Sequence, residues 1–492
     1  MRRYGRVASA SVVSALLLTT LGYQVGSLAT RAAAVVPSVS VTGPVSAGTP
    51  TLNGTLYGTY IDVAQLGYKR SEFFISGTAH SYVPVTPLTS DGDWNVTTGA
   101  SAPYTTRILV YRPVDPTKFN GTVIVEWLNV SGGIDDSPEW TLAHNELVRE
   151  GFAWVGVSAQ QVGVNAAKKT DLTDYASLSH PGDSFSYDIF SQAGEVVRTD
   201  AAMILGNLKP RTVLAAGESQ SAFRLMTYID AVQPTADVYN GFLVHSQFGT
   251  GAALSQAPQP LYATPKPTTI RSNLGVPVFE FETETDVSNS NLTDRTFYGD
   301  PKNFRLWEVA GSSHYDYYGL SIGFNDTGNG QDAVENLAAM QHPTNTPVGG
   351  FVCGTPINTG GTHWVLDTAV YWLNQWVVNG TPPPTAPYLQ TTRSSPVVFA
   401  RDANGNALGG VRSPQVDAPL AALGGVGNNP KFCSLFGTTV PLSAGRLASL
   451  YPTHAQFVFD WDLATYAGVV GGYLVRQDGV DLINAATASR IG

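Results

Sequence analysis

Short apolar segments alternate with segments of helical periodicity through most of the chain, and this alternation restricts the possible folds more than any other feature. The segments TRILVYRP, GTVIVEWLNV and FAWVGVSA have the length and composition of buried strands, and EWTLAHNELVREG has the 3.6-residue period of a helix. Strands that are apolar throughout and alternate with helices are typical of a mainly parallel sheet covered by helices on both faces. The sequence therefore predicts an α/β fold with such a sheet at its centre.

The same alternation extends to about residue 380, and different patterns flank it. Further strands are expected in TVLAAGES, ADVYNGFLVHSQ, VPVFEFETETD and FRLWEVAGSSH, and helices in SQAGEVVRTDAAMILGNL and THWVLDTAVYWLNQWVVNG. Residues 40–95 contain short alternating runs that predict antiparallel strands, and the chain becomes loop-rich after the Pro-rich segment 379–387. We therefore expect an α/β domain with insertions over residues 35–385 and a loop-rich C-terminal extension over residues 386–492, packed on this core.

Residues 1–34 have the pattern of an export signal. A basic start, MRRYGR, precedes a stretch rich in Ala, Val, Leu and Ser over residues 7–28, and RAAAVV offers a small-residue cleavage site after Ala34. A transmembrane anchor is the alternative, but the Ser, Thr and Gln residues in the stretch make it a poor membrane span. A twin-arginine signal at Arg2 and Arg3 fits weakly. We expect a protein that is secreted or held in the cell envelope, with no stable membrane insertion after cleavage.

Composition excludes several classes of protein and partner. Of the 492 residues, 43% are hydrophobic and 13% are charged, which is incompatible with a disordered chain and sufficient for a large core. The formal net charge is -10 and no basic cluster follows the first few residues, so a nucleic-acid partner is not expected. The composition makes no prediction of the oligomeric state.

The chain contains two cysteines, Cys353 and Cys433. An even number of cysteines in an oxidising compartment favours a disulfide between them, and two free buried thiols are the alternative. Both cysteines lie in loop-rich segments, where a covalent link would help to order the chain. No Cys/His spacing suggests a zinc site, so no metal is expected.

A candidate nucleophile, Ser219, lies where the apolar run 212–216 changes into a segment of helical periodicity. The motif GESQS at residues 217–221 is close to G-x-S-x-G, the nucleophile elbow, in which small neighbours leave the serine oxygen exposed in a strained turn. Ser221 replaces the second glycine of that motif. The alternative is a serine that caps the N-terminus of the helix, so other residues must decide between the two interpretations.

Two further strand ends supply the partners that a serine nucleophile needs. Asp286 follows PVFEFETET and His314 follows LWEVAGSS, in the order serine, acid, histidine of the α/β-hydrolase triad. A neutral imidazole would take the serine proton, and a carboxylate would hold the imidazole in the required tautomer. A structural, hydrogen-bonded histidine is the alternative for His314. Glu284 is the alternative acid because it also ends the strand, whereas Asp286 is preferred because it lies further into the following loop.

An oxyanion hole requires backbone N–H groups that point at the developing charge. The residue after the nucleophile, Gln220, is expected to supply one of them. The loop after TVIVEWLNV contains adjacent glycines, which allow close backbone approach to a ligand, and Val130 or Ser131 is expected to supply the other. A plain glycine-rich turn is the alternative. The polar segment 178–194 and His245 lie at the same strand ends, where they either line the site or make structural hydrogen bonds.

Several motifs together resemble one family of proteins. VEWLNVSGG, SHPGDSFSYDIFSQAG, GESQSA, ETETD, GSSH and CGTPIN are similar, in this order, to motifs of a poorly characterised family of bacterial exported α/β-hydrolase-domain proteins, from about residue 54 to the C-terminus. The resemblance implies an α/β-hydrolase fold and hydrolysis of carboxylic esters, with Ser219 as the nucleophile, His314 as the base and Asp286 or Glu284 as the acid. Ser221 in place of the elbow glycine departs from the pattern.

The residues and the resemblance predict an exported serine hydrolase that cleaves a small-molecule or polymeric carboxylic ester through an acyl-enzyme, without a metal or organic cofactor. A serine peptidase or amidase on the same fold is the first alternative. The second is a catalytically silent α/β-hydrolase fold that serves as a binding protein. The complete set of serine, acid and histidine argues against this second alternative.

Overall fold

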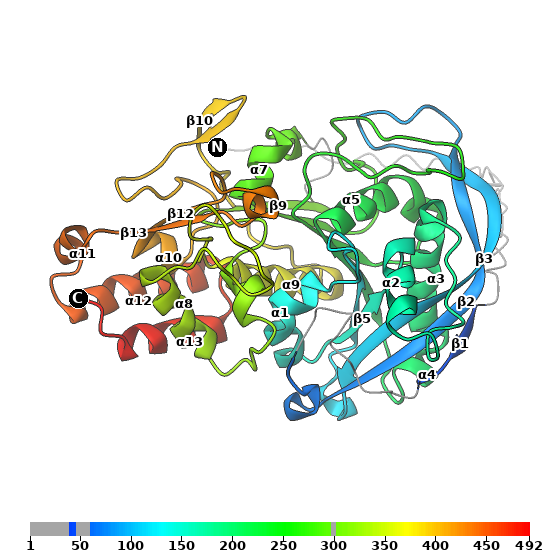
Figure 1. Cartoon of the computed structure of the whole chain (residues 1–492), viewed down its shortest axis with the longest axis horizontal. Coiled ribbons are helices and arrows are strands. Elements are labelled where there is room, and N and C mark those ends of the chain that lie inside the picture. Colours follow the sequence, from blue (N-terminus) through cyan, green and yellow to red (C-terminus); the bar gives the residue numbers. More distant parts are fainter. Residues whose placement is uncertain (1–38, 46–59, 297–301) are drawn as a thin grey trace, which may run out of the picture. The chain divides into compact units, whose positions relative to one another are not determined.

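A nine-stranded sheet runs through the part of the chain that the computed structural model describes, which is residues 39–45, 60–296 and 302–492. The export signal expected over residues 1–34 lies outside the described residues. The strands lie in the order β1-β2-β3-β5-β4-β6-β7-β8-β9. They are β1 (Ser40–Thr42), β2 (Tyr68–Pro84), β3 (Val96–Pro113), β4 (Thr122–Trp127), β5 (Ala153–Val157), β6 (Thr212–Glu218), β7 (Gly241–His245), β8 (Val278–Thr283) and β9 (Phe304–Val309) (Figure 1).

Strand direction divides the sheet into two parts. The pairs β1–β2, β2–β3 and β3–β5 are antiparallel, and every pair from β5 through β4, β6, β7 and β8 to β9 is parallel. All residues of β4, β5, β6, β7 and β8 are buried, which explains why β4 to β7 are mostly apolar. The strand β8 is buried although it alternates apolar residues with Glu280 and Glu282. The predicted parallel sheet and the predicted N-terminal antiparallel strands are therefore both confirmed.

Helices cover both faces of the sheet. They are α1 (Pro138–Arg149), α2 (Gln161–Thr170), α3 (Ser186–Thr199), α4 (Ala201–Ile204), α5 (Gln220–Thr227), α6 (Gln233–Ala236), α7 (Glu284–Ser290), α8 (Gln331–Gln341) and α9 (Thr362–Asn379). Short 3-10 turns lie at Val63–Leu66, Pro116–Lys118, Asp183–Phe185, Thr293–Thr296 and Lys431–Leu435, and π-helical turns at Tyr228–Val232 and Tyr318–Ile322.

Alternate residues of each central strand enter two separate hydrophobic cores. In β6, Leu214 packs in a core with residues of α1, α8 and α9, and Val213 packs in a core with residues of α3 and α5. This two-residue alternation is what a sheet with two covered faces requires. The sheet therefore carries a core on each side, and its strand ends are left to form a site.

Two expectations about helices were wrong in their boundaries. The segment 178–194 was expected to lie between a strand and a helix, but its second half forms the first turns of α3, which begins at Ser186. Tyr187, Ile189 and Phe190 are buried there, and the polar residues between them obscure the helical period in the sequence. The expected helix over residues 191–208 is also interrupted at Asp200, between α3 and α4.

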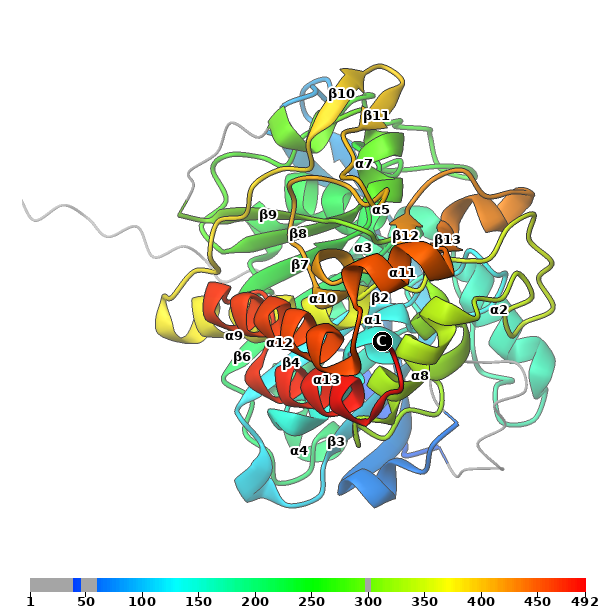
Figure 2. The ribbon, with the colours of Figure 1, turned by 90° about the vertical axis from the view of Figure 1, so that its left-hand side faces the viewer.

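The C-terminal extension contains two short hairpins and several helices. Its elements are β10 (Thr391–Ser394), β11 (Val397–Phe399), α10 (Pro414–Asp417), β12 (Ala421–Gly424), β13 (Thr438–Pro441), α11 (Ala444–Leu450), α12 (His454–Gly471) and α13 (Arg476–Ala488) (Figure 2). Phe457 and Trp461 of α12 are buried in the same core as α9, and the Trp372 indole donates a hydrogen bond to the Gly472 carbonyl at 2.8 Å. The extension thus packs on the core.

The two cysteines form a disulfide, as expected. Cys353 and Cys433 are bonded, with their Cα atoms 5.5 Å apart and a sequence separation of 80. Both are buried in a small cluster with Leu320, Ile357 and Phe436. Across the described ranges, none of the helices combines the length and hydrophobicity that crossing a bilayer requires.

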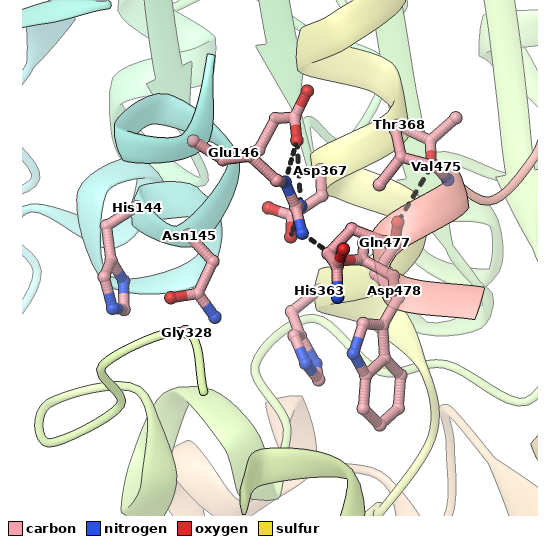
Figure 3. Close-up of polar contacts among 12 residues, drawn as sticks. His144, Asn145, Glu146, Gly328, His363, Asp367, Thr368, Val475, Gln477 and Asp478 are labelled. Atoms are coloured by element: carbon pink, nitrogen blue, oxygen red, sulfur yellow. Dashed lines mark hydrogen bonds and ion pairs between the residues drawn. The ribbon is translucent and has the colours of Figure 1, made fainter. Parts of the chain in front are cut away.

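A buried ion cluster joins α13 to α1 and α9 (Figure 3). The Arg149 guanidinium lies 2.8 Å from Glu146, 3.6 Å from Asp367 and 2.8 Å from Asp478. Burial raises the pKa of Glu146 to about 8 and that of Asp478 to about 6, although Arg149 opposes both shifts. Burial and the neighbouring Asp478 also raise the pKa of Asp367. One guanidinium therefore faces three carboxyl groups whose pKa values burial raises.

We expect the protein to lose stability as pH rises from about 4 to about 8. Unfolded Asp and Glu titrate near pH 4, so the raised pKa values of Glu146 and Asp478 give stability that is complete below that pH. This stability is lost as the pH rises through about 6, where Asp478 ionises, and through about 8, where Glu146 ionises. Asp478→Asn should make the fall of Tm between pH 5 and pH 8 smaller, as measured by calorimetry. Glu335→Gln, at an exposed position of α8, is the control. An unchanged fall in the Asp478 variant would contradict this account.

Candidate active site

Ser219 lies in a strained turn between β6 and α5. Its backbone has φ 57° and ψ -120°, outside the regions that non-glycine residues usually adopt, and its N–H donates to the His245 carbonyl at 2.9 Å. A Cβ atom at Gly217 would lie 3.2 Å from backbone atoms of Ser221, so the turn has little room for a larger residue there. This geometry is that of a nucleophile elbow, and Ser221 fits its second small position. The interpretation of Ser219 as a helix cap is wrong, because its side chain makes no capping hydrogen bond to α5.

His314 and Asp286 complete a continuous line of contacts from Ser219. The His314 Nε2 atom lies 2.8 Å from the Ser219 hydroxyl, and its Nδ1 atom lies 2.6 Å from Asp286 Oδ1. His314 and Asp286 are buried, whereas Ser219 is half-buried. The imidazole nitrogen that faces Ser219 can accept its proton while the other nitrogen donates to a carboxylate.

Asp286 lies in the first turn of a helix and not, as was expected, in a loop. The expected strand VPVFEFETETD ends at Thr283, and α7 begins at the next residue, Glu284. Asp286 is therefore in the first turn of a helix, where its Oδ2 accepts from the Thr283 N–H at 2.7 Å in a reciprocal capping box. The Ser246 hydroxyl donates to the same oxygen at 2.7 Å. These bonds leave Oδ1 directed at His314.

Glu284, the alternative acid, is held elsewhere. One of its oxygens lies 2.8 Å from Arg401 and the other accepts from the Gly311 N–H at 2.8 Å. Burial raises the pKa of Glu284 in spite of Arg401. Burial also pushes the pKa of Asp286 upward, but His314, Thr283 and Ser246 outweigh it and hold that pKa below its ordinary value. Of the two carboxyl groups, Asp286 is the one placed and charged to face His314.

Glu218 is a site residue that the sequence analysis missed. Its Oε1 atom lies 3.3 Å from His314 Nε2, and its Oε2 atom accepts from the Asn129 amide at 3.1 Å. Burial, with the nearby Glu139 and Asp286, raises the pKa of Glu218 well above its ordinary value, which favours the neutral acid. The sequence shows Glu218 directly before Ser219 in the motif. Successive side chains of a strand point to opposite faces, so the sequence gave no reason to expect Glu218 next to the His314 imidazole.

The loop expected to form part of an oxyanion hole is tied to the elbow. The Asn129 amide donates to the Glu218 carbonyl at 3.1 Å, and Asn129 Oδ1 accepts from the Ser131 N–H at 2.7 Å. The Ser131 N–H is therefore engaged within the loop. Gln220 occupies the first position of α5, where a backbone N–H has no acceptor within the helix.

Polar residues from the segment 178–194 lie near the site but are held by their own hydrogen bonds. Asp183 accepts from the Gln160 side chain at 3.1 Å and from Arg224 at 3.2 Å, and the Gln220 side chain donates to Gln160 at 2.9 Å. His180 contacts the Ala159 carbonyl at 2.9 Å. These hydrogen bonds favour the structural interpretation of this segment, and a role in lining the site stays a prediction.

The other candidate, His245, is fully buried, and its Nδ1 atom lies 3.3 Å from Glu139. The Phe248 ring lies 5.1 Å from the His314 ring and 5.4 Å from the Phe223 ring. In the described ranges, no three His, Cys, Asp or Glu side chains are grouped as a metal site would need. Ser219, His314 and Asp286 are joined by the contacts described above.

Comparisons with known proteins find one matching family model and several similar solved structures. Residues 41–484 match a family model described as an alpha/beta hydrolase domain. A search of curated proteins finds no match. Among solved structures, the chain is similar to a fungal esterase from Rhizomucor miehei, with 14% identity, 48% of this chain and 74% of that chain covered, and a TM-score of 0.26. It is also similar to a lipase/esterase from Lactobacillus plantarum, with 13% identity, 39% of this chain and 78% of that chain covered, and a TM-score of 0.26. A carboxylesterase from the same organism is similar with 11% identity, 44% of this chain and 76% of that chain covered, and a TM-score of 0.27.

Proposed function

Because this chain belongs to the alpha/beta hydrolase domain family, we propose that it is an exported serine hydrolase that cleaves carboxylic esters. The observation that carries the proposal is the line of contacts from Asp286 through His314 to Ser219, at 2.6 Å and 2.8 Å. The order of these residues in the chain and the strained backbone of Ser219 support it further.

In the proposed reaction, Ser219 Oγ attacks the ester carbonyl carbon while its proton moves to His314 Nε2. Asp286 holds the His314 Nδ1 proton and stabilises the imidazolium that forms. The tetrahedral intermediate then breaks its bond to the alcohol oxygen, which takes the proton from Nε2. Water, activated by the neutral His314, hydrolyses the acyl-enzyme and regenerates Ser219.

The proposed oxyanion hole consists of the backbone N–H groups of Gln220 and Val130. Gln220 follows the nucleophile at the start of α5. Ser131 is the weaker candidate for the second donor, because its N–H already bonds to Asn129. Such donors stabilise negative charge on the carbonyl oxygen of the intermediate without reorganisation during the reaction.

Export to an oxidising compartment is part of the proposal. The expected signal over residues 1–34 places the chain outside the cytoplasm, and the disulfide between Cys353 and Cys433 is a feature that persists in such a compartment. The substrate is a small-molecule or polymeric ester, and neither a nucleic-acid partner nor a cofactor enters the reaction.

We expect a fluorophosphonate probe to label the folded protein at Ser219, since this probe requires an activated serine. Peptide mapping of the labelled protein checks the position. Turnover of p-nitrophenyl esters of different chain length, beside aminoacyl anilides, then separates an esterase from a peptidase or amidase. Folded protein that takes no label and turns over none of these substrates would favour the silent binding fold instead.

A further inference from the structure

The outward face of α12 is apolar along its whole length. Phe459, Leu463, Tyr466 and Val470 are 62%, 57%, 65% and 66% exposed, and the other exposed residues of this helix are Ala455 and Ala467. Their spacing of three or four residues places them on one face of the helix. Figure 2 shows α12 beside α13 at the side that faces the viewer.

The opposite face of α12 is apolar as well, because it packs into the protein core. Phe457, Trp461, Thr465 and Gly468 are its buried residues. A contiguous apolar patch on the surface commonly marks an interaction site. The exposed side of α12 therefore has the character of a surface that is covered in the working protein.

We call the exposed row of Phe459, Leu463, Tyr466 and Val470 the ridge. A pocket of about 680 Å³ adjoins it. Val469 and Gly472 at the end of α12 line it, together with Trp372, Leu474 and Val480. Glu146, Thr368, Val475 and Gln477, which Figure 3 draws, also line it. Because Val469 lines the pocket and Val470 ends the ridge, the two features are continuous on one surface.

A ridge and an adjoining pocket on the same surface suit a second copy of the same chain. In a two-fold dimer each surface faces its own copy, so the ridge of one chain can enter the pocket of the other and the reverse. The four large ridge side chains expose very roughly 500 Å² of apolar area. A standard interface buries about 800 Å² from each partner, so the ridge would supply more than half of this area and the residues around it the remainder.

Charge also favours a second copy. The helix α12 carries Asp460 and Asp462 and has no Lys or Arg, which disfavours binding to an anionic lipid surface. Arg476, which is exposed, lines the pocket, and Asp462, which is half-buried, lies one helical turn from Tyr466 of the ridge. We propose that a second copy of this chain covers α12 in a two-fold dimer, with each ridge in the other copy's pocket and Asp462 paired with Arg476 across the interface.

Sedimentation equilibrium of the purified full chain tests the proposal without reference to activity. The wild type should have twice the chain mass at concentrations of about 10 µM and above, and Leu463→Glu should be a monomer because it places a charge in the ridge. Leu172→Glu, at a position 73% exposed outside α12, is the matched control and should remain a dimer. A monomeric wild type, or a Leu463→Glu variant that stays dimeric, would overturn the proposal.

A charge exchange tests the pairing itself. Asp462→Arg and Arg476→Asp should each raise the dimer dissociation constant roughly 10-fold, and the double variant should return it to near the wild-type value. No rescue in the double variant would refute this contact. Sedimentation with neutral phosphatidylcholine vesicles tests the alternative that a lipid surface covers α12. A monomer that sediments with the vesicles would assign the apolar face to a lipid surface and overturn the dimer.

Discussion

Replacement of Ser219 by alanine is expected to lower kcat for ester hydrolysis by at least about 10³-fold. The substitution removes the hydroxyl that lies 2.8 Å from His314 Nε2 and leaves Glu218 Oε1 in place, 3.3 Å from the same nitrogen. Stability should change little, because Ser219 is half-buried and its hydroxyl caps no helix. Steady-state kinetics on the best p-nitrophenyl ester, with the thermal unfolding of both proteins, provides the measurement.

Ser221→Ala is the matched control for this experiment. Ser221 lies two residues away on the same turn, and its hydroxyl is buried without a hydrogen-bond partner in the described part of the chain. Its loss should leave kcat within a few-fold of the wild type. If a folded Ser219→Ala protein keeps most of its activity, the proposed mechanism is wrong, and the label expected at Ser219 should then be absent as well.

Replacement of Asp286 by asparagine is expected to lower kcat by roughly 10⁴-fold. The asparagine amide would present an N–H group to His314 Nδ1, which favours the tautomer whose Nε2 carries a proton and cannot accept one from Ser219. The effect should appear in kcat more than in KM, because Asp286 is buried behind the imidazole. Kinetics of the folded variant at neutral pH provides the measurement.

Glu284→Gln is the control, since Glu284 lies two residues away at the start of the same helix. It should cost stability, because it weakens the buried contact with Arg401 at 2.8 Å. The folded fraction should keep activity near that of the wild type. The reverse ranking, with Glu284→Gln inactive and Asp286→Asn active, would transfer the role of the acid to Glu284.

Local features of the sequence were sufficient to predict that Ser219 and His314 lie close together. Each follows an apolar run of strand length, and the carboxyl ends of parallel strands meet at one edge of a sheet. Their approach to 2.8 Å therefore follows from the same pattern that predicts the sheet. The disulfide was predictable for a simpler reason, since a chain with two cysteines has one possible intramolecular pairing.

Local features of the sequence did not decide between Glu284 and Asp286 as the acid that faces His314. Strand periodicity places Glu284 and Asp286 on the same side of an extended chain, but the chain leaves the strand at Thr283 and turns into α7. In the helix the two side chains diverge. Arg401, which lies 117 residues later in the sequence, then holds Glu284.

The amino-acid sequence by itself determined the layered α/β architecture and the strand ends at which a nucleophile and a base would meet, because hydrophobic period and chain order are local properties. Only the tertiary structure decided which carboxyl group faces His314, that Glu218 also contacts its Nε2 atom, and that one face of the apolar helix α12 is left uncovered. The physical reason is the same in each case. Distances between side chains, and the burial of a helix face, depend on segments that are remote in the sequence and adjacent only in the folded chain.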